Sequence, residues 1–293
     1  MNTIWIDLLG SESRFYDAGG IRTRCIEAGD GEPVIFLHGV GGHAEAFARN
    51  VVPMSQNFHA ISLDCLGFGL TDRPAEPASR EDYITHLLNF MDAAGIEKAH
   101  LVGESFGGWL AFWTAITHPD RVSKLISVCG AQLAVKADEQ SQRHLDAGRA
   151  ELRRLSQQFA AEPTRENMRA RLNWLFHRPD RDVTEELVDV RLAIYQRALE
   201  QEHADTGHRP VVGPGSHGGS FTPDVLAKIT QPTLMLWTEF NPSATAAMAE
   251  IASGYLPDGH FRLMEDCAHW PQWEQPERFN SIITEFLGTS GRE

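Results

Sequence analysis

One serine of the chain stands in a setting that could make it a nucleophile. It occupies the centre of the motif Gly103-x-Ser105-x-Gly107, between an apolar stretch at residues 99–102 and an apolar run at residues 109–113. A strand, a sharp turn and a helix in this order hold a serine in a strained backbone conformation at the end of the strand. The turn requires neighbours without a Cβ, and the positive end of the following helix lies close to the hydroxyl. The motif therefore predicts that Ser105 attacks an electrophilic carbon.

A serine nucleophile needs a base and a site for the negative charge that develops on the substrate oxygen. His269 follows the last predicted strand, at residues 260–264, and the loop after that strand is where a sheet of this order places the base. An oxyanion hole requires two backbone donors aimed at the developing charge. We expect the N–H groups of Phe106 and Val40 as these donors, with Gly41 as the alternative to Val40.

The third member of the triad is the unusual one. An aspartate is usually expected four residues after Trp237, but Asn241 stands there, and the nearest carboxylate is Glu239. An asparagine can orient an imidazole, but it cannot balance the charge of an imidazolium, and in a serine protease this exchange costs about 10⁴ in rate. We expect Asn241 to accept a hydrogen bond from Nδ1–H of His269. Glu239, or a carboxylate from elsewhere in the fold, is the alternative.

Short apolar strands alternate with amphipathic helices over much of the chain. The first two strands are expected to pair antiparallel around the turn at residues 18–20, and a helix capped by Ser79 and Asp82 is expected to end at Gly95. This alternation predicts the α/β class with a mostly parallel, doubly wound sheet. The strands are expected at residues 14–16, 21–27, 33–37, 59–64, 99–103, 122–128, 233–237 and 260–264.

The regular alternation stops between residues 132 and 221. That segment is helical and charged, and it closes with a glycine-rich loop at residues 211–219. Such an insertion between two core strands indicates a helical cap over the site. We therefore expect a core of residues 1–131 and 222–293 and a cap or lid of residues 132–221. The cap helices are expected at residues 149–159, 166–176 and 184–199.

The composition narrows the classes of partner. The 293 residues carry 40 acidic and 26 basic side chains, and the net charge of −14 disfavours nucleic acid and anionic membranes. No apolar run approaches the roughly 18 residues of a membrane span, and the first residues lack a basic leader region, so a cytoplasmic protein is expected. The 13 histidines show no metal-site spacing, so no metal is expected. The cysteines are expected to be reduced, buried thiols (Cys25, Cys65, Cys129 and Cys267).

With these motifs in place, the chain resembles the α/β-hydrolases, and more narrowly the meta-cleavage product hydrolases. The resemblance extends from about Phe15 to Leu287, and its general part is the segment at residues 103–108 together with residues 118–122. The chain departs from the usual pattern at three places that matter for chemistry. Glu104 stands in place of Asn, Asn241 stands in place of Asp, and the oxyanion loop at residues 40–43 replaces a Gly-Gly-Pro-Gly run. The narrower likeness rests on the segments at residues 49–51, 184–191 and 269–274.

The resemblance implies particular roles for residues in these three segments. Asn50 is implied to lie at the active site, Arg191 to hold the substrate carboxylate from a cap helix, and Trp270 to form an aromatic wall. A planar carboxylate suits a guanidinium fork, which supports the role of Arg191. The implied enzyme needs no cofactor, its partner is a small-molecule substrate, and a homodimer is left open.

The implied reaction is the hydrolysis of a carbon–carbon bond in a 2-hydroxy-6-oxo-dienoate from aromatic ring cleavage. One rival is a carboxylesterase or lactonase that uses the same residues on a small ester. A rival from another class is a ligand receptor of the same fold that turns over slowly. Haloalkane dehalogenases and epoxide hydrolases are disfavoured, because both need an aspartate where Ser105 stands.

Overall fold

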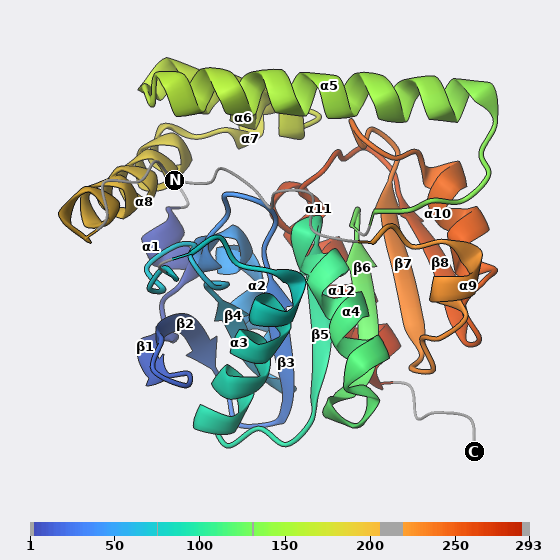
Figure 1. The fold of residues 1–293 in the computed structure, drawn as a ribbon, viewed down its shortest axis with the longest axis horizontal. Coiled ribbons are helices and arrows are strands. Elements are labelled where there is room, and N and C mark those ends of the chain that lie inside the picture. Colours follow the sequence, from blue (N-terminus) through green and yellow to red (C-terminus); the bar gives the residue numbers. More distant parts are fainter. Residues whose placement is uncertain (1–2, 75, 131, 206–218, 289–293) are drawn as a thin grey trace.

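The computed structural model describes residues 3–74, 76–130, 132–205 and 219–288 of the chain. Within them, eight strands form one sheet: β1 (Glu12–Asp17), β2 (Arg22–Ala28), β3 (Glu32–Leu37), β4 (Phe58–Leu63), β5 (Ala99–Glu104), β6 (Val122–Val128), β7 (Thr233–Thr238) and β8 (Gly259–Met264). Their order in the sheet is β1-β2-β4-β3-β5-β6-β7-β8 (Figure 1). β2 pairs antiparallel with β1 and β4, and the remaining neighbours are parallel. The predicted α/β class and mostly parallel sheet are confirmed.

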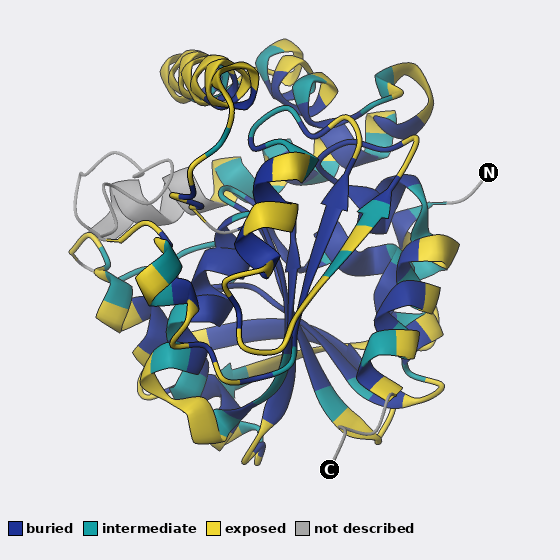
Figure 2. Cartoon of the chain, turned by 90° about the vertical axis from the view of Figure 1, so that its right-hand side faces the viewer, coloured by how far each residue is buried: buried dark blue, intermediate teal, exposed yellow. Residues whose placement is uncertain are grey.

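The two faces of the sheet belong to two separate apolar clusters. Along β3, Val34 and Phe36 lie in one cluster, whereas Ile35 and Leu37 lie in the other. This alternation explains why the sequence shows continuous apolar runs, since a parallel strand is covered on both faces. Figure 2 shows the buried sheet between layers of helices whose outer sides are exposed.

Helices cover both faces of the sheet. The cluster that contains Leu37 is closed by α3 (Arg80–Ala93), α4 (Phe106–Thr117) and α10 (Ala246–Ser253). The opposite cluster is closed by α2 (Ala48–Met54) and α12 (Pro276–Gly288). The remaining core elements are short: α1 (Ile4–Asp7), α9 (Pro223–Leu226), α11 (Pro271–Glu274) and 3-10 turns at Ala44–Phe47 and Pro119–Arg121.

The predicted capping box at the start of α3 is present. Ser79 Oγ accepts a hydrogen bond from the N–H of Asp82 at 3.2 Å, and the Asp82 carboxylate accepts one from the N–H of Ser79 at 2.8 Å. The helix ends before Gly95, which adopts φ +70°, a conformation that glycine reaches without steric cost. Both ends of this helix therefore follow from local sequence.

Among the described residues, four helices lie between β6 and α9: α5 (Glu139–Ala161), α6 (Arg165–Leu175), α7 (Pro179–Asp182) and α8 (Glu185–Asp205). The long α5 lies across the carboxyl ends of the strands (Figure 1). The segment leaves and rejoins the core at one place, because Leu133 and Phe221 form an isolated bridge. On this basis we keep, as a proposal, the division into a core of residues 1–131 and 222–293 and a cap of residues 132–221.

The first cap helix is longer than predicted. The sequence pattern indicated residues 149–159, but α5 begins at Glu139, because Asp138 caps it by accepting a hydrogen bond from the N–H of Ser141 at 2.8 Å. The other two predicted cap helices correspond to α6 and α8. Apart from Gly219, the glycine-rich loop predicted at residues 211–219 lies outside the described residues.

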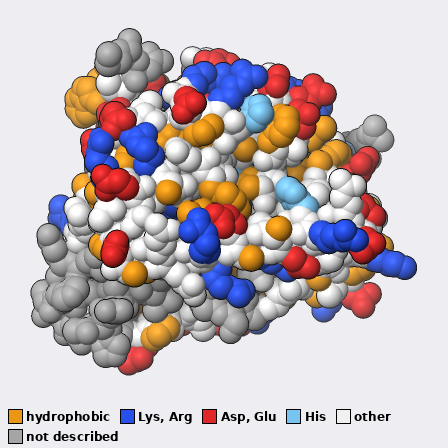
Figure 3. Space-filling model, turned by 90° about the horizontal axis from the view of Figure 1, so that it is seen from above, with side chains coloured by type: hydrophobic (Ala, Val, Ile, Leu, Met, Phe, Trp, Pro, Cys, Tyr) orange, Lys and Arg blue, Asp and Glu red, His pale blue; other side chains and the backbone are white. Residues whose placement is uncertain are grey.

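Four further features of the described residues concern the surface, the cysteines, the helices and the metal-binding side chains. Seen from above, the cap face carries acidic, basic and apolar side chains next to one another (Figure 3). All four cysteines are buried and free of disulfides. None of the helices in the described ranges combines the length and the apolar character that crossing a bilayer would take. The same residues hold no group of three or more His, Cys, Asp or Glu side chains arranged to bind a metal ion.

Candidate active site

Ser105 lies on a strained turn between β5 and α4. Its backbone has φ +52° and ψ −111°, a conformation that is rare for a residue with a side chain. The flanking glycines are required sterically: a Cβ on Gly107 would lie 2.0 Å from the carbonyl oxygen of Leu37, and one on Gly103 would lie 2.2 Å from that of Gly107. The strand–turn–helix geometry expected from the motif is therefore present.

His269 and Asn241 meet through the contact that the spacing from Trp237 predicts. His269 Nδ1 lies 2.7 Å from Asn241 Oδ1. The amide orientation is set by the Nδ2 group of Asn241, which donates to the carbonyl of Ala244 at 2.8 Å. Because Oδ1 can only accept, the proton of the neutral ring sits on Nδ1, which leaves Nε2 as the acceptor. The catalytic role of this pair stays a prediction.

Glu239, the alternative third member, is exposed and faces away from the imidazole. Its Oε2 accepts a hydrogen bond from the N–H of Asp266 at 3.1 Å. No described hydrogen bond or ion pair joins Glu239 to His269. The geometry favours Asn241 over Glu239 as the residue that orients the ring.

Asn241→Asp is expected to keep or raise kcat near neutral pH, because it adds a negative charge beside the imidazolium that forms during catalysis. Glu239→Gln is expected to change kcat little. Steady-state kinetics on both variants and on Asn241→Ala measure this. A collapse on Glu239→Gln, with Asn241→Ala tolerated, would identify Glu239 as the third member instead.

Both triad loops are tied to the cap by hydrogen bonds. His144 of α5 places its Nε2 2.9 Å from the backbone carbonyl of Asn241. The N–H of His269 donates to the carbonyl of Leu175, the last residue of α6, at 2.9 Å. The cap thus contacts the loop of the base and the loop of its orienting residue.

The predicted oxyanion donors lie on either side of Ser105. Phe106 is the first residue of α4, so its N–H has no acceptor within the helix. In the facing loop, the N–H of Gly42 bonds to the carbonyl of Gly39 at 2.9 Å, whereas no described backbone bond uses the N–H of Val40. Val40, Ser105 and Phe106 line the same cavity. Their assignment as an oxyanion hole stays a prediction.

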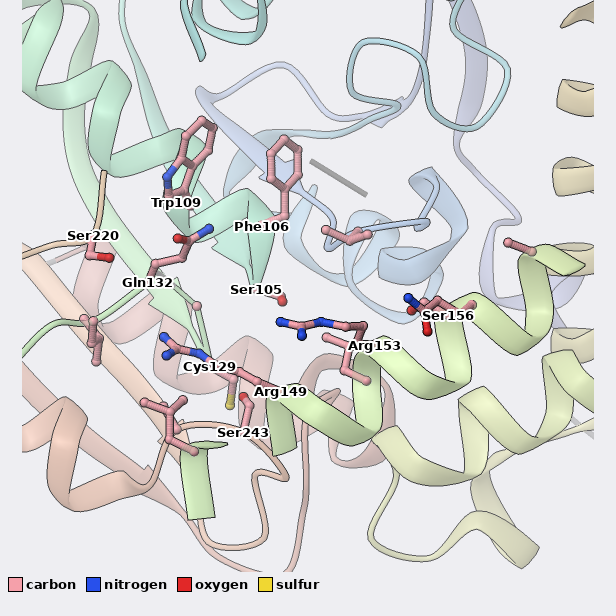
Figure 4. Close-up of a pocket in the computed structure, with 18 residues that line it drawn as sticks. Ser105, Phe106, Trp109, Cys129, Gln132, Arg149, Arg153, Ser156, Ser220 and Ser243 are labelled. Atoms are coloured by element: carbon pink, nitrogen blue, oxygen red, sulfur yellow. The ribbon is translucent and has the colours of Figure 1, made fainter. Parts of the chain in front are cut away.

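A cavity of about 740 Å³ opens between the core and α5, and Ser105 lies in its wall. Its volume is in the range of sites that enclose a small molecule. Trp109 and Cys129 contribute from the core, and Gln132 from the first residue of the cap. The facing wall comes from α5, with Leu145, Arg149, Leu152, Arg153 and Ser156 (Figure 4).

The guanidinium groups of Arg149 and Arg153 point into this cavity (Figure 4). Among the described residues, neither has an ion pair or a hydrogen bond, in contrast to Arg154, whose Nη2 lies 2.7 Å from Glu151. Neither arginine belongs to a motif in the sequence that predicts a site residue. Their spacing of four residues places them on one helix face together with Leu145. This spacing was the only feature of the sequence that could have indicated that they face the same cavity.

Arg191 and Trp270 lie together beside the oxyanion loop. Arg191 is 3% exposed, its Nη2 donates to the carbonyl of Gly41 at 2.8 Å, and its guanidinium carbon lies 5.0 Å from the ring centre of Trp270. Its Nε and Nη1 have no partner among the described residues. Burial, followed by the nearby Arg171, lowers the pKa of Arg191 to about 9. Arg191 is therefore a desolvated cation with unused donors at the oxyanion loop, although neither it nor Trp270 belongs to the described lining of the cavity. Their roles stay predictions.

Arg171 of α6 is a second buried guanidinium at this loop, and the sequence did not reveal it. It is 4% exposed, and its Nη2 donates to the carbonyl of Val40 at 3.1 Å. Asn50, in contrast, is buried elsewhere, where its Nδ2 donates to the carbonyl of Gln272 at 3.1 Å and to Asn280 Oδ1 at 2.8 Å. It is absent from the described lining of the cavity, and its role stays a prediction.

Glu104, the residue before the nucleophile, contacts the base directly. Its Oε1 lies 3.1 Å from Nε2 of His269, and its side chain is 1% exposed. Neither carboxylate oxygen forms a hydrogen bond with a described residue. The sequence marked this position as unusual but did not predict the contact.

Comparisons with known proteins place this geometry in a family. The model of the alpha/beta hydrolase fold matches residues 32–276, which is more than half of the chain. The chain therefore belongs to the α/β-hydrolase fold family. A 2-hydroxy-6-oxononadienedioate/2-hydroxy-6-oxononatrienedioate hydrolase of Klebsiella pneumoniae is 31% identical over 94% of this chain and 95% of that protein.

Two further proteins agree with this relationship. A 2-hydroxymuconate semialdehyde hydrolase of Pseudomonas sp. (strain CF600) is 28% identical over 92% of both chains. The solved structure of a meta-cleavage product hydrolase from Pseudomonas fluorescens IP01 superposes with a TM-score of 0.75 at 27% identity, covering 96% of this chain and 98% of that one. The resemblance to meta-cleavage product hydrolases inferred from sequence is confirmed.

Proposed function

We propose that the protein hydrolyses a carbon–carbon bond in a 2-hydroxy-6-oxo-dienoate. The observation that carries this proposal is the buried Arg191, which offers unused donors at the oxyanion loop beside Ser105. An ester hydrolase has no need of such a group, whereas a dienoate brings a carboxylate that the guanidinium can bind. The relatives named above support the same substrate class.

In the proposed reaction, His269 first takes the proton of the dienol hydroxyl and returns a proton to a carbon of the diene, so the dienol becomes a ketone and His269 is again neutral. Ser105, or a water activated by His269, then bonds to the distal ketone carbon, and the oxygen that takes the electron pair is held by Val40 and Phe106. The adjacent carbon–carbon bond breaks, and its electron pair and a proton end on the departing fragment. The products are a carboxylic acid and a 2-hydroxydienoate, with one water consumed.

The cavity also supports a class of distal substituent. Arg149 and Arg153 bring two cations without described partners into the part of the cavity that α5 covers. A substrate with a second carboxylate at its distal end would compensate this charge. We therefore propose a dienedioate in preference to a substrate with an apolar end.

Replacing both Arg149 and Arg153 by Gln is expected to raise KM about threefold to tenfold for a dienoate with a distal carboxylate, because exposed ion pairs are individually weak. A dienoate with a distal methyl group should be unaffected. Arg154→Gln is the matched control on the same helix, since Arg154 pairs with Glu151. Equal effects on both substrates would remove the argument for the diacid.

A spectrophotometric screen decides between the candidate activities. Purified protein is offered coloured dienoates and short p-nitrophenyl esters in parallel. Turnover of dienoates well above that of esters supports the proposal, and the reverse identifies a carboxylesterase or lactonase. Stoichiometric binding with almost no turnover of either would identify a receptor.

A cytoplasmic location and a homodimeric state complete the proposal. The four buried free cysteines support a reducing compartment. Light scattering on the purified chain measures the oligomeric state.

A further inference from the structure

The charge that a triad normally carries on its third member is missing here, because Asn241 is neutral. A carboxylate nevertheless contacts the imidazole from the other side, where Glu104 Oε1 lies 3.1 Å from Nε2 of His269. The two ring nitrogens thus have different partners, a neutral amide on Nδ1 and a carboxylate beside Nε2.

The carboxylate contacts Nε2 without a described hydrogen bond, and no described hydrogen bond joins Ser105 to this nitrogen. At 3.1 Å the two atoms are within ion-pair distance, yet neither oxygen of Glu104 forms a hydrogen bond with a described residue. A hydrogen bond along the Nε2 axis would block transfer of the proton from Ser105. Glu104 forms no such described bond, and the field of a carboxylate at 3.1 Å stabilises positive charge on the ring.

The loop opposite β5 leaves room for this carboxylate. A Cβ on Gly39 would lie 2.4 Å from Oε2 of Glu104. A side chain at position 39 would therefore force the Glu104 carboxylate to shift. The position that Glu104 adopts beside the base thus requires glycine at position 39.

We propose that Glu104 is a positioning residue that supplies, through His269, the negative charge that Asn241 lacks. When Ser105 Oγ bonds to the substrate carbon, its proton passes to Nε2 and the ring becomes an imidazolium. The Glu104 carboxylate stabilises that imidazolium, while Asn241 keeps the ring oriented. The kinetic part of this inference rests on the proposed function, but the titration of the ring does not.

Several other charged or titratable groups lie near Glu104 and His269. Two of them are cations, which disfavour an imidazolium, and two are neutral. Arg171 and Arg191 are buried cations that also feel the charge of Glu104. Burial lowers the pKa of His38 to about 4, so it is neutral near pH 7. Burial likewise raises the pKa of Cys129 well above its ordinary value, so it stays a thiol. A second buried carboxylate, Glu274, accepts a hydrogen bond from the N–H of Ala268 at 2.9 Å, and burial raises its pKa to about 7. Glu104 is the carboxylate that contacts the ring itself.

The direct test follows the ¹⁵N signals of the His269 ring by NMR across pH, with His269→Gln to assign them. In Glu104→Gln the midpoint of the ring titration is expected to fall by about 1 to 3 pH units, since a carboxylate at this distance favours the charged ring. Glu239→Gln removes a charge from the neighbouring loop and serves as the matched control, with an unchanged midpoint. This readout needs no substrate, so it is independent of the proposed activity.

The kinetic test is a double-mutant cycle of Glu104→Gln and Asn241→Asp on the best substrate from the screen. Glu104→Gln is expected to lower kcat about 10²- to 10³-fold, with little change in KM, and to move the rising limb of the pH profile to lower pH. Asn241→Asp should restore at least about tenfold in the Glu104→Gln background and much less in the wild type. A carboxylate with a merely structural role would show no such rescue.

Two results would overturn the inference: an unchanged ring titration in Glu104→Gln, or the same effect of Asn241→Asp on kcat in the Glu104→Gln background as in the wild type. Glu104→Asn, which has the residue that the family usually carries at this position, repeats both measurements if the Gln variant does not fold. A melting temperature for each variant separates a loss of charge from a loss of structure.

Discussion

Ser105→Ala is expected to lower kcat by at least about 10³ while leaving substrate binding intact. The variant keeps the strained turn and the cavity, so only the atom that forms the covalent bond is removed. No other group in the cavity is expected to replace it. Cys129 lines the same cavity, but burial raises its pKa well above the ordinary value and keeps it as the unreactive thiol.

Rapid-mixing kinetics and equilibrium binding of a dienoate measure both parts of this expectation. Ser123→Ala on β6, outside the described lining of the cavity, is the matched control. If Ser105→Ala retained most of the activity, the serine mechanism would be wrong, and a water activated by His269 would be the attacking group.

Arg191→Ala is expected to cost about 2–5 kcal/mol in kcat/KM for acidic substrates. The guanidinium is almost fully buried, and a substrate carboxylate would satisfy the donors that have no described partner. Neutral esters that fit the cavity should be nearly unaffected. Arg197→Ala changes an exposed arginine on the same helix and controls for effects on α8 itself.

The same group predicts a pH dependence. Because burial lowers the pKa of Arg191 to about 9, the free enzyme loses this cation as the pH rises through that value. KM for a dienoate should therefore rise above about pH 9, whereas KM for a neutral ester should not. An equal loss on both substrate classes in Arg191→Ala would mean that the change disturbs the cap, and the dienoate proposal would lose its main support.

The elements that the sequence predicts well are those whose signals are local. The predicted strand at residues 122–128 coincides with β6, and the helix that Ser79 caps is α3. Both were predictable because helix caps, turns and apolar runs depend on residues that are neighbours in the sequence. The contact between His269 and Asn241 was predictable for a related reason, since both follow parallel strands whose carboxyl ends meet at one edge of the sheet.

The parts that could not be predicted from sequence are side-chain contacts between distant segments and one helix start. Arg171 and Arg153 belong to predicted helices, but periodicity does not say which loop or cavity a charged side chain of the cap will face. The contact of Glu104 with His269 joins residues far apart in the chain. The start of α5 was not predicted, because Asp138, its N-cap residue, stands in a long charged segment where no apolar pattern marks the first turn of a helix.

The hydrogen bonds from the cap to the triad loops limit when chemistry can occur. His144 bonds to the backbone of Asn241, and the backbone of His269 bonds to Leu175. A cap that swings away from the core must break these bonds and release both loops. An open entrance and an aligned base therefore exclude each other, so the protein would react only with a substrate that it has already enclosed, and a reactive intermediate would stay shielded from bulk water until the cap moves again.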